Sequence, residues 1–281
     1  MLLPLPLRTL NIFEAPAHHK GDRLLVGRWK KRRVIALFAV WILLLLAVLS
    51  FLSLLEATFS ALPDSHTIVS VSWAGYIVSS SFNHQRDITA VSGSWTVPTV
   101  NASAGDGYSS AWVGIGGQQD KALIQVGTEQ NVVNGQAFYD AWYEMLPAYS
   151  VKIDGIIITP GDQISASITL ANSDANQWNI QIADATTGQF FSQDFFYNAS
   201  RSSGEWILER STVNGQISNL ADFGSVAFSN CRIGLSSDMG VIGNFTYSIV
   251  HMTNQQYDRL ATTSLLGADG ASFTVTYDMS A

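Results

Sequence analysis

The chain has 281 residues and a mass of 30.5 kDa, enough for one large domain or two small ones. Its formal net charge of -7 hides a basic beginning, because residues 1–55 hold eight basic and two acidic side chains. Only seven Lys or Arg side chains occur in residues 56–281, so this part lacks the basic groove that nucleic-acid binding needs. Cys231 is the only cysteine, which excludes an intrachain disulfide and a zinc site built from several cysteines.

An uncharged apolar run covers residues 34–55 and follows five basic side chains at residues 28–33. At about 1.5 Å per residue, a helix of this length would cross a hydrocarbon core of roughly 30 Å. The sequence therefore predicts one transmembrane helix acting as a signal anchor, with residues 1–33 as a basic cytoplasmic segment and the rest of the chain extracytoplasmic. Small side chains at residues 57, 60 and 61 leave open a cleaved signal peptide and a secreted domain.

Beyond residue 55, Ser, Thr, Asn, Gln, Gly and aromatic residues dominate, and no stretch has the 3.6-residue apolar period of a helix. Turn signals such as Pro160-Gly161-Asp162 separate short alternating segments, which indicates antiparallel strands. The predicted strands are 69–78, 88–97, 110–115, 122–127, 137–145, 153–158, 163–170, 178–183, 190–197, 205–210, 226–233, 244–252 and 272–277. Residues 254–266 are predicted to be a loop or a short helix. The sequence thus predicts a tether over residues 56–64 and one all-β domain, a sandwich or barrel, over residues 65–281.

The sequence of this domain contains little evidence for a metal site or for a serine-type catalytic triad. Its three histidines, His66, His84 and His251, have no spacing typical of a ligand set, so we expect no metal and no cofactor. No Gly-x-Ser-x-Gly motif is present, and the histidines have no evident Ser and Asp partners. Carboxylates and amides are therefore the candidate reactive groups.

Strand alternation gathers such groups on single faces, because side chains two residues apart point the same way. In the segment Tyr139-Asp140-Ala141-Trp142-Tyr143-Glu144 one face is acidic and aromatic. The segments around Trp112, Gln125 and Glu209 each present one polar or indole face beside an apolar one. The side chains placed on such faces are Trp112, Gln125, Asp140, Trp142, Glu144, Glu205 and Glu209. Faces of this composition could line a groove.

Taken in order, these segments resemble the glutamic peptidase family, the eqolisins. The blocks that carry the resemblance are Trp73-Ala74-Gly75-Tyr76, Ser94-Trp95-Thr96-Val97-Pro98, Ala111-Trp112-Val113-Gly114-Ile115, Ile124-Gln125-Val126-Gly127, Tyr139-Asp140-Ala141-Trp142-Tyr143-Glu144, Thr186-Thr187-Gly188-Gln189 and Glu205-Trp206-Ile207-Leu208-Glu209. The resemblance covers most of residues 73–281. This chain departs from the secreted, disulfide-bonded fungal members in its single cysteine and its predicted anchor, and its connection from Trp112 to Gln125 is about one residue shorter.

The resemblance implies an endopeptidase that acts in acid, on a concanavalin-like sandwich of two bent antiparallel sheets. It implies that Gln125 and Glu209 are the catalytic pair, and it puts four further residues around the substrate cleft, namely Trp112, Asp140, Trp142 and Glu144. The substrate would be a protein or peptide, and no cofactor is implied. In such a pair Glu209 would activate a water molecule, while Gln125 would stabilise the tetrahedral intermediate.

Two alternatives stay open at the level of sequence. A glycoside hydrolase on a similar sandwich would use Glu144 and Glu209 as its paired carboxylates and tryptophans as sugar platforms. A surface domain that binds carbohydrate or peptide would use the same grooves without turnover. Gln125 discriminates between the enzymes, because a glycosidase has no need of it.

Overall fold

The computed structural model describes residues 40–50 and 65–278. Residues 40–50 form a helix that rises about 16 Å at about 1.5 Å per residue. The prediction of a transmembrane helix over residues 34–55 is wrong, because no helix of the described residues is long and apolar enough to cross a membrane. The described helix reaches only about half of the roughly 30 Å required.

Several predictions about the N-terminal part fall on residues that are not described. The basic segment of residues 1–33 and the tether of residues 56–64 both lie outside the described residues. The extracytoplasmic location of the domain is not tested by the fold and stays a prediction.

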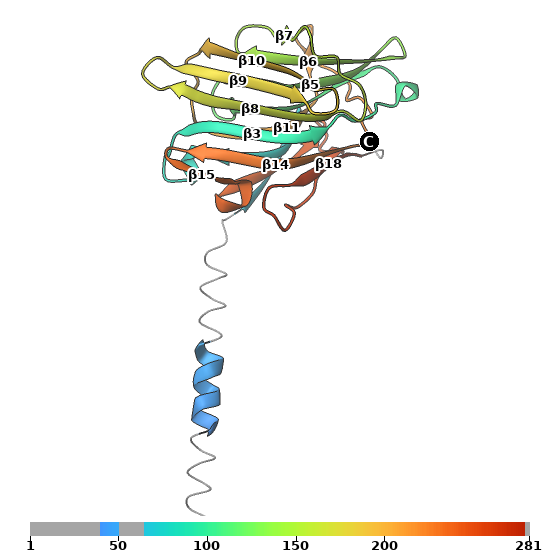
Figure 1. Cartoon of the computed structure of the whole chain (residues 1–281). Coiled ribbons are helices and arrows are strands. Elements are labelled where there is room, and N and C mark those ends of the chain that lie inside the picture. The colour runs from blue at the N-terminus through green and yellow to red at the C-terminus, as the bar shows by residue number, and fades with distance from the viewer. Residues whose placement is uncertain (1–39, 51–64, 279–281) are drawn as a thin grey trace, which may run out of the picture. The chain divides into compact units, whose positions relative to one another are not determined.

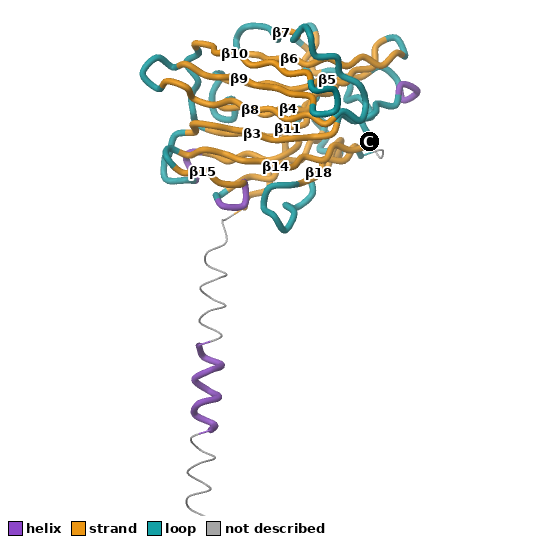
Figure 2. Tube along the Cα trace, in the orientation of Figure 1, coloured by secondary structure: helices purple, strands orange, loops and turns teal. Residues whose placement is uncertain are grey.

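Strands dominate residues 65–278, as Figures 1 and 2 show. The strands are β1 (Ser65–Ser70), β2 (Trp73–Ser79), β3 (Ile88–Thr96), β4 (Gly107–Gly116), β5 (Leu123–Val133), β6 (Gln136–Met145), β7 (Val151–Lys152), β8 (Gln163–Asn172), β9 (Gln177–Asp184), β10 (Gln189–Phe196), β11 (Ser203–Glu209), β12 (Thr212–Val213), β13 (Gln216–Ile217), β14 (Ser225–Leu235), β15 (Asp238–Val241), β16 (Tyr247–Thr253), β17 (Arg259–Thr263) and β18 (Phe273–Tyr277). Three single 3-10 turns, Ser80–Phe82, Ala102–Ala104 and Ile242–Asn244, interrupt them. The all-β prediction is confirmed.

Three predicted segments differ from the structure, and the short strands β7, β12, β13 and β15 were not predicted. The predicted strand 69–78 is two strands, because the Ser70 hydroxyl accepts hydrogen bonds from the backbone N–H groups of Ser72 and Trp73 and bends the chain there. Residues 153–158 form no strand, since a turn at Asp154 and Gly155 interrupts them. The segment predicted as a loop or helix contains β17, which is held by pairing with β16 and β18. Short strands of this kind depend on their partners more than on their own pattern.

The strands form two packed layers within one continuous ladder. One layer has the order β10, β9, β8, β3, β14, and these strands lie side by side in Figure 1. The other has the order β16, β2, β11, β4, β5, β6, β7, and β17 and β18 connect the two. Strands β3 and β8 contact β4 across the interior, which makes the arrangement a sandwich.

Side chains from one face of each strand fill the space between the layers and form the core. On β4 and β11 the inward side chains include Val113, Ile115, Trp206 and Leu208, all fully buried. The Trp206 indole N–H donates to the Ser92 carbonyl at 2.7 Å, so this large side chain is buried without an unpaired donor. The opposite side of β11, β4, β5 and β6 then faces away from the core.

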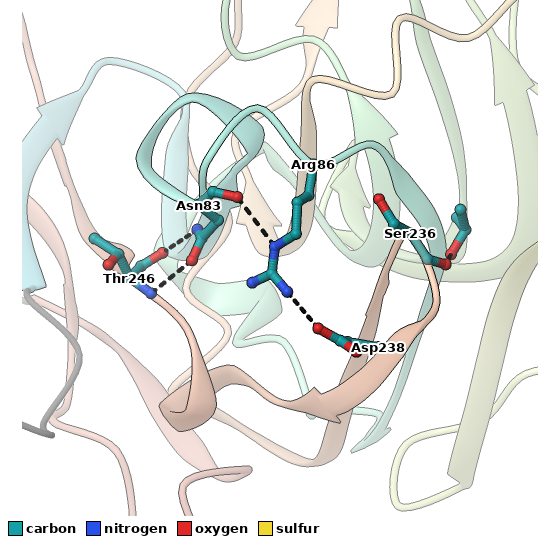
Figure 3. Close-up of polar contacts among 6 residues, drawn as sticks. Asn83, Arg86, Ser236, Asp238 and Thr246 are labelled. Carbon is teal, nitrogen blue, oxygen red and sulfur yellow. Dashed lines mark hydrogen bonds and ion pairs between the residues drawn. The ribbon is translucent and has the colours of Figure 1, made fainter.

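A network of polar contacts connects the segment after β2 to β15 and to the residue before β16 (Figure 3). The Asn83 amide donates to the Thr246 carbonyl at 2.9 Å and accepts from the Thr246 N–H at 3.0 Å. Arg86 donates to the Asn83 carbonyl and forms an ion pair with Asp238. These contacts join the end of β2 to β15 and to the start of β16, so the strand that carries Trp73 is fixed at its far end.

Candidate active site

The outward side chains of β2, β11, β4, β5 and β6 form a surface that we call the site face. Its strand register aligns these side chains in three rows across the strands. The central row, which we call the indole row, contains Ile207, Trp112, Gly127 and Trp142. The row on one side contains Glu209, Ser110, Glu129 and Asp140, and the row on the other side contains Glu205, Gly114, Gln125 and Glu144. Gln125 and Glu209 therefore flank the indole row on opposite sides.

The indole row is buried despite its outward direction. Trp112 is fully buried and Trp142 is 7 % exposed. Gly127 has to be glycine here, because a Cβ atom would lie 2.5 Å from the Trp112 Cβ and 2.3 Å from the Ala111 carbonyl oxygen. The Trp112 ring leans over Gly114, where a Cβ atom would lie 2.8 Å from the ring. Two glycines thus make the room that the indole of Trp112 occupies.

Glu209 lies at the end of β11, where indole groups surround its carboxylate. The Trp112 Nε1 donates to Glu209 Oε2 at 2.9 Å. Trp73 packs edge-on against Trp112 with ring centroids 5.2 Å apart. Burial raises the pKa of Glu209 from 4.5 to about 7, opposed by hydrogen bonding from Trp112 and Trp73, and the charge of Glu144 raises it further. Below neutral pH the carboxyl is mainly protonated.

Gln125 is 3 % exposed and bonds to the next strand. Its Nε2 donates to Glu144 Oε2 at 2.6 Å, which leaves a second N–H on the same nitrogen. Its Oε1 is buried with no hydrogen-bond partner among the described residues. Burial raises the pKa of Glu144, and the hydrogen bond from Gln125 opposes that rise. The amide thus combines a free acceptor with a free donor.

The remaining predicted cleft residues lie on β6. Trp142 belongs to the indole row, and its Nε1 has no partner within residues 65–278. Asp140 is part-exposed and forms an ion pair with Lys152 of β7. The structure thus joins Gln125 to Glu144 and Glu209 to Trp112, while Asp140 lies at the rim. No direct hydrogen bond between Gln125 and Glu209 occurs in the described part of the chain.

Three residues of the site face were not among the predicted site residues. Trp73 contacts Trp112, and Glu129 lies in the same row as Glu209 and Asp140. Glu205 is fully buried with no partner for either carboxylate oxygen in the described chain, and burial raises its pKa well above the usual value. The period of two along the strands already puts Glu205 on the face of Glu209, and it could also have found Glu129, which lies four residues from Gln125.

The chemistry available at this site belongs to carboxyl, amide and indole groups. Within residues 40–50 and 65–278 no group of three His, Cys, Asp or Glu side chains is arranged to hold a metal ion. A carboxyl group with a raised pKa can take up and release a proton near neutral pH. An amide with one free donor and one free acceptor can orient water and stabilise negative charge. Such a set fits hydrolysis by a general acid and base.

Comparison with known proteins decides the family. The sequence profile of the Peptidase A4 family matches residues 71–277. The chain belongs to this family. The peptidase is 30% identical over 232 residues to Aspergillopepsin-2 of Aspergillus niger, covering 74% of this chain and 78% of that protein. It is also 30% identical over 199 residues to Scytalidopepsin B of Scytalidium lignicola, covering 66% of this chain and 72% of the relative.

Solved structures agree with the sequence comparison. Scytalido-glutamic peptidase with a transition state analog inhibitor is 25% identical, with a TM-score of 0.62 over 74% of this chain and 99% of that one. The same enzyme with a peptide-based transition state analog gives a TM-score of 0.61 at 25% identity, with the same coverage. Aspergilloglutamic peptidase from Aspergillus niger is 31% identical, with a TM-score of 0.54 over 61% of this chain and 99% of that one.

These findings confirm the predicted membership of the glutamic peptidase family and the predicted all-β sandwich. The protein is a peptidase and therefore a hydrolase. The alternatives of a glycoside hydrolase and of a non-catalytic binding domain are not supported, because the family match covers nearly the whole described domain.

Proposed function

We propose that the protein is an endopeptidase that hydrolyses protein or peptide substrates with Gln125 and Glu209 as its catalytic pair. The observation that carries the proposal is the position of the two side chains on opposite sides of the buried indole row. A peptide that lies along this row would pass between them. The bound peptide-based analog of the related scytalido-glutamic peptidase supports a peptide substrate for this chain.

In the proposed mechanism, ionised Glu209 removes a proton from a water molecule as its oxygen attacks the carbonyl carbon. The carbonyl electron pair moves to the oxygen, and the free N–H of Gln125 donates to this oxyanion. When the intermediate collapses, the C–N bond breaks and protonated Glu209 returns the proton to the leaving nitrogen. Glu144 holds the Gln125 amide in place through their hydrogen bond. Trp112 holds the Glu209 carboxylate in the same way.

The pH at which the reaction is fastest distinguishes whether Glu209 acts first as a base or first as an acid. The family resemblance implies activity in acid, whereas a pKa of about 7 leaves only on the order of one in a hundred Glu209 side chains ionised at pH 5. If the free carboxyl controls the rate as a base, kcat/KM rises with pH up to about 7. If activity peaks at about pH 4 instead, protonated Glu209 enters the reaction first as the proton donor.

The experiment that tests the proposal compares kcat/KM of Glu209→Gln, Gln125→Ala and the unchanged protein on an unfolded protein and on defined peptides. We expect Glu209→Gln to abolish cleavage, because an uncharged amide of nearly the same shape cannot take up the water's proton. Gln125→Ala should lower kcat by on the order of 100-fold or more, the scale of losing one oxyanion donor.

Glu144→Gln is the matched control, because it changes a neighbouring carboxyl of the same face. It should lower activity less than Glu209→Gln does, and thermal melts should show that all three variants fold. Activity near that of the unchanged protein in Gln125→Ala would refute the catalytic pair.

A further inference from the structure

A hollow of about 330 Å³ lies beside the site face, between β1, β2 and residues 117–118. Its floor is apolar, because Ile77 and Val250 are each only 1 % exposed and belong to the same cluster as Trp112. Trp73 lines this hollow and also packs edge-on against Trp112. The hollow is therefore adjacent to the indole row of the candidate active site.

The strand register shows how a substrate would reach the hollow. The indole row continues beyond Ile207 through Gly75 on β2 and Val250 on β16 to Ile68 on β1. Ile68 and Val250 both line the hollow. The row that passes between Gln125 and Glu209 thus ends in this hollow on the side of β2.

We propose that the hollow is a specificity pocket, which receives an apolar side chain of the substrate three or four residues from the scissile bond. The inference rests on the proposed function, since that function puts the scissile bond between Gln125 and Glu209. The strand between β11 and β5 is β4, and neighbouring strands lie about 4.8 Å apart, so β2 and β16 are about 10 and 14 Å from β4. An extended peptide advances about 3.3 Å per residue and covers this distance in three or four residues.

The lining determines which side chain fits. No charged residue lines the hollow, and its polar groups, such as those of Ser72 and Gln118, lie with the apolar floor of Ile77 and Val250. Its volume equals the share of about ten water molecules at about 30 Å³ each, which leaves room for a Leu or an aromatic side chain. An apolar side chain would displace this water and cover the floor, whereas a carboxylate would lose hydration without gaining a partner.

The test measures kcat/KM on peptides that carry Leu, Phe, Ala, Asp or Lys at one position within four residues of the scissile bond, on either side. Ser72→Leu puts apolar bulk into the hollow, and Val71→Leu is its control because Val71 is 38 % exposed and does not line the hollow. We expect Ser72→Leu to lower kcat/KM about tenfold for peptides with Leu or Phe at one position three or four residues away, and less than twofold for Ala there. Val71→Leu should change neither.

Ile68→Asp is a second variant that does not depend on filling space. Ile68 is 36 % exposed on β1, so the change leaves the core intact. A carboxylate at the hollow should reverse the preference at that one position, lowering kcat/KM for Leu and raising it for Lys by about tenfold. A uniform loss over all peptides in both variants, or a preference that does not move, would overturn the specificity pocket.

The failure of this inference is distinguishable from failure of the proposed function. Short peptides that end before the hollow should be cleaved equally by Ser72→Leu and by the unchanged protein. Glu209→Gln should lose activity on short and long peptides alike. If Glu209→Gln stays active, the catalytic pair is wrong; if only the Ser72 and Ile68 variants behave unexpectedly, the pocket alone is wrong.

Discussion

The sandwich has two outer faces that are formed by the same alternation of side chains along strands but differ in the exposure of their polar groups. The far face, formed by outward side chains of β14, β3, β8, β9 and β10, has a hollow of about 420 Å³ lined by Ser92, Ser94, Ser165 and Ser167 and also by apolar and charged side chains such as Phe190 and Arg232. The four serine hydroxyls are at least part-exposed, so water can satisfy them. On the site face, by contrast, polar groups such as those of Gln125 and Glu205 are buried.

The difference arises from what covers each face. Leu123 and Leu146 pack in one apolar cluster with Trp112 and Trp142 of the indole row and help to exclude water there. Carboxyl groups on the same strands then keep their protons to higher pH, as Glu205 and Glu209 do. An outward position on a strand is therefore not enough to identify a functional site. Apolar side chains that exclude water are also needed, because they raise the pKa of the carboxyl groups beside them.

The largest expected effect comes from Glu205, a fully buried carboxyl whose pKa burial raises and the Ser203 hydroxyl lowers by a smaller amount. A folded-state pKa above the unfolded value means that folding favours the protonated form, so stability falls as the pH rises through the folded pKa. Glu205→Gln should therefore raise Tm at pH 8 by about 5 °C or more, the scale of about 2 kcal/mol, and change Tm little at pH 4. Asp194→Asn, the same change at an exposed carboxyl of the far face, should leave Tm nearly constant across this range. An equal rise at both pH values would show that charge is not the cause.

Removing the indole donor to Glu209 should have the next largest effect. Trp112→Phe keeps an aromatic ring and removes the hydrogen bond to Glu209, which favours the ionised form by about 1.5–3 kcal/mol. The pKa of Glu209 should therefore rise, and the ascending limb of a kcat/KM profile should move to higher pH. Trp178→Phe removes a similar donor to the Tyr197 carbonyl within the far layer, and it should change Tm without moving the profile.

A methyl group on Gly114 tests the close approach of the Trp112 ring. A Cβ atom would lie 2.8 Å from the ring, so Gly114→Ala should displace the indole, cost about 1–3 kcal/mol of stability and lower kcat/KM. Gly93→Ala on β3 meets the Trp206 ring at the same 2.8 Å but faces the core. Chemical denaturation should give similar losses for both, and only Gly114→Ala should reduce activity beyond the loss of folded protein.

The smallest effect is expected on the far face. Ser165→Ala and Ser167→Ala remove hydroxyl groups that water can replace, so each should change stability by less than about 0.5 kcal/mol. Peptidase activity should stay the same in both. A loss of activity without a loss of stability would mean that the far face takes part in the reaction, and the contrast between the two faces would fail.

The sequence determined the family, the all-β class and most strand positions. Alternation shows which side chains share a face, and the order of the blocks around Trp112, Gln125, Asp140 and Glu209 carries the resemblance. These features are local, because each depends only on residues near in the chain. The transmembrane helix expected from the apolar run of residues 34–55 is not supported, because no helix of the described residues is long and apolar enough to span a membrane.

Only the tertiary structure decided which outward-facing side chains are buried from solvent. The alignment of β11, β4, β5 and β6 puts Gln125 and Glu209 on opposite sides of the indole row, although they are far apart in sequence. The carboxylate of Glu209, whose burial raises its pKa, is surrounded by side chains from other strands, namely Trp112 on β4 and Trp73 on β2. Strand pairing and burial depend on contacts between residues that are far apart in the chain, so a local sequence pattern does not predict them.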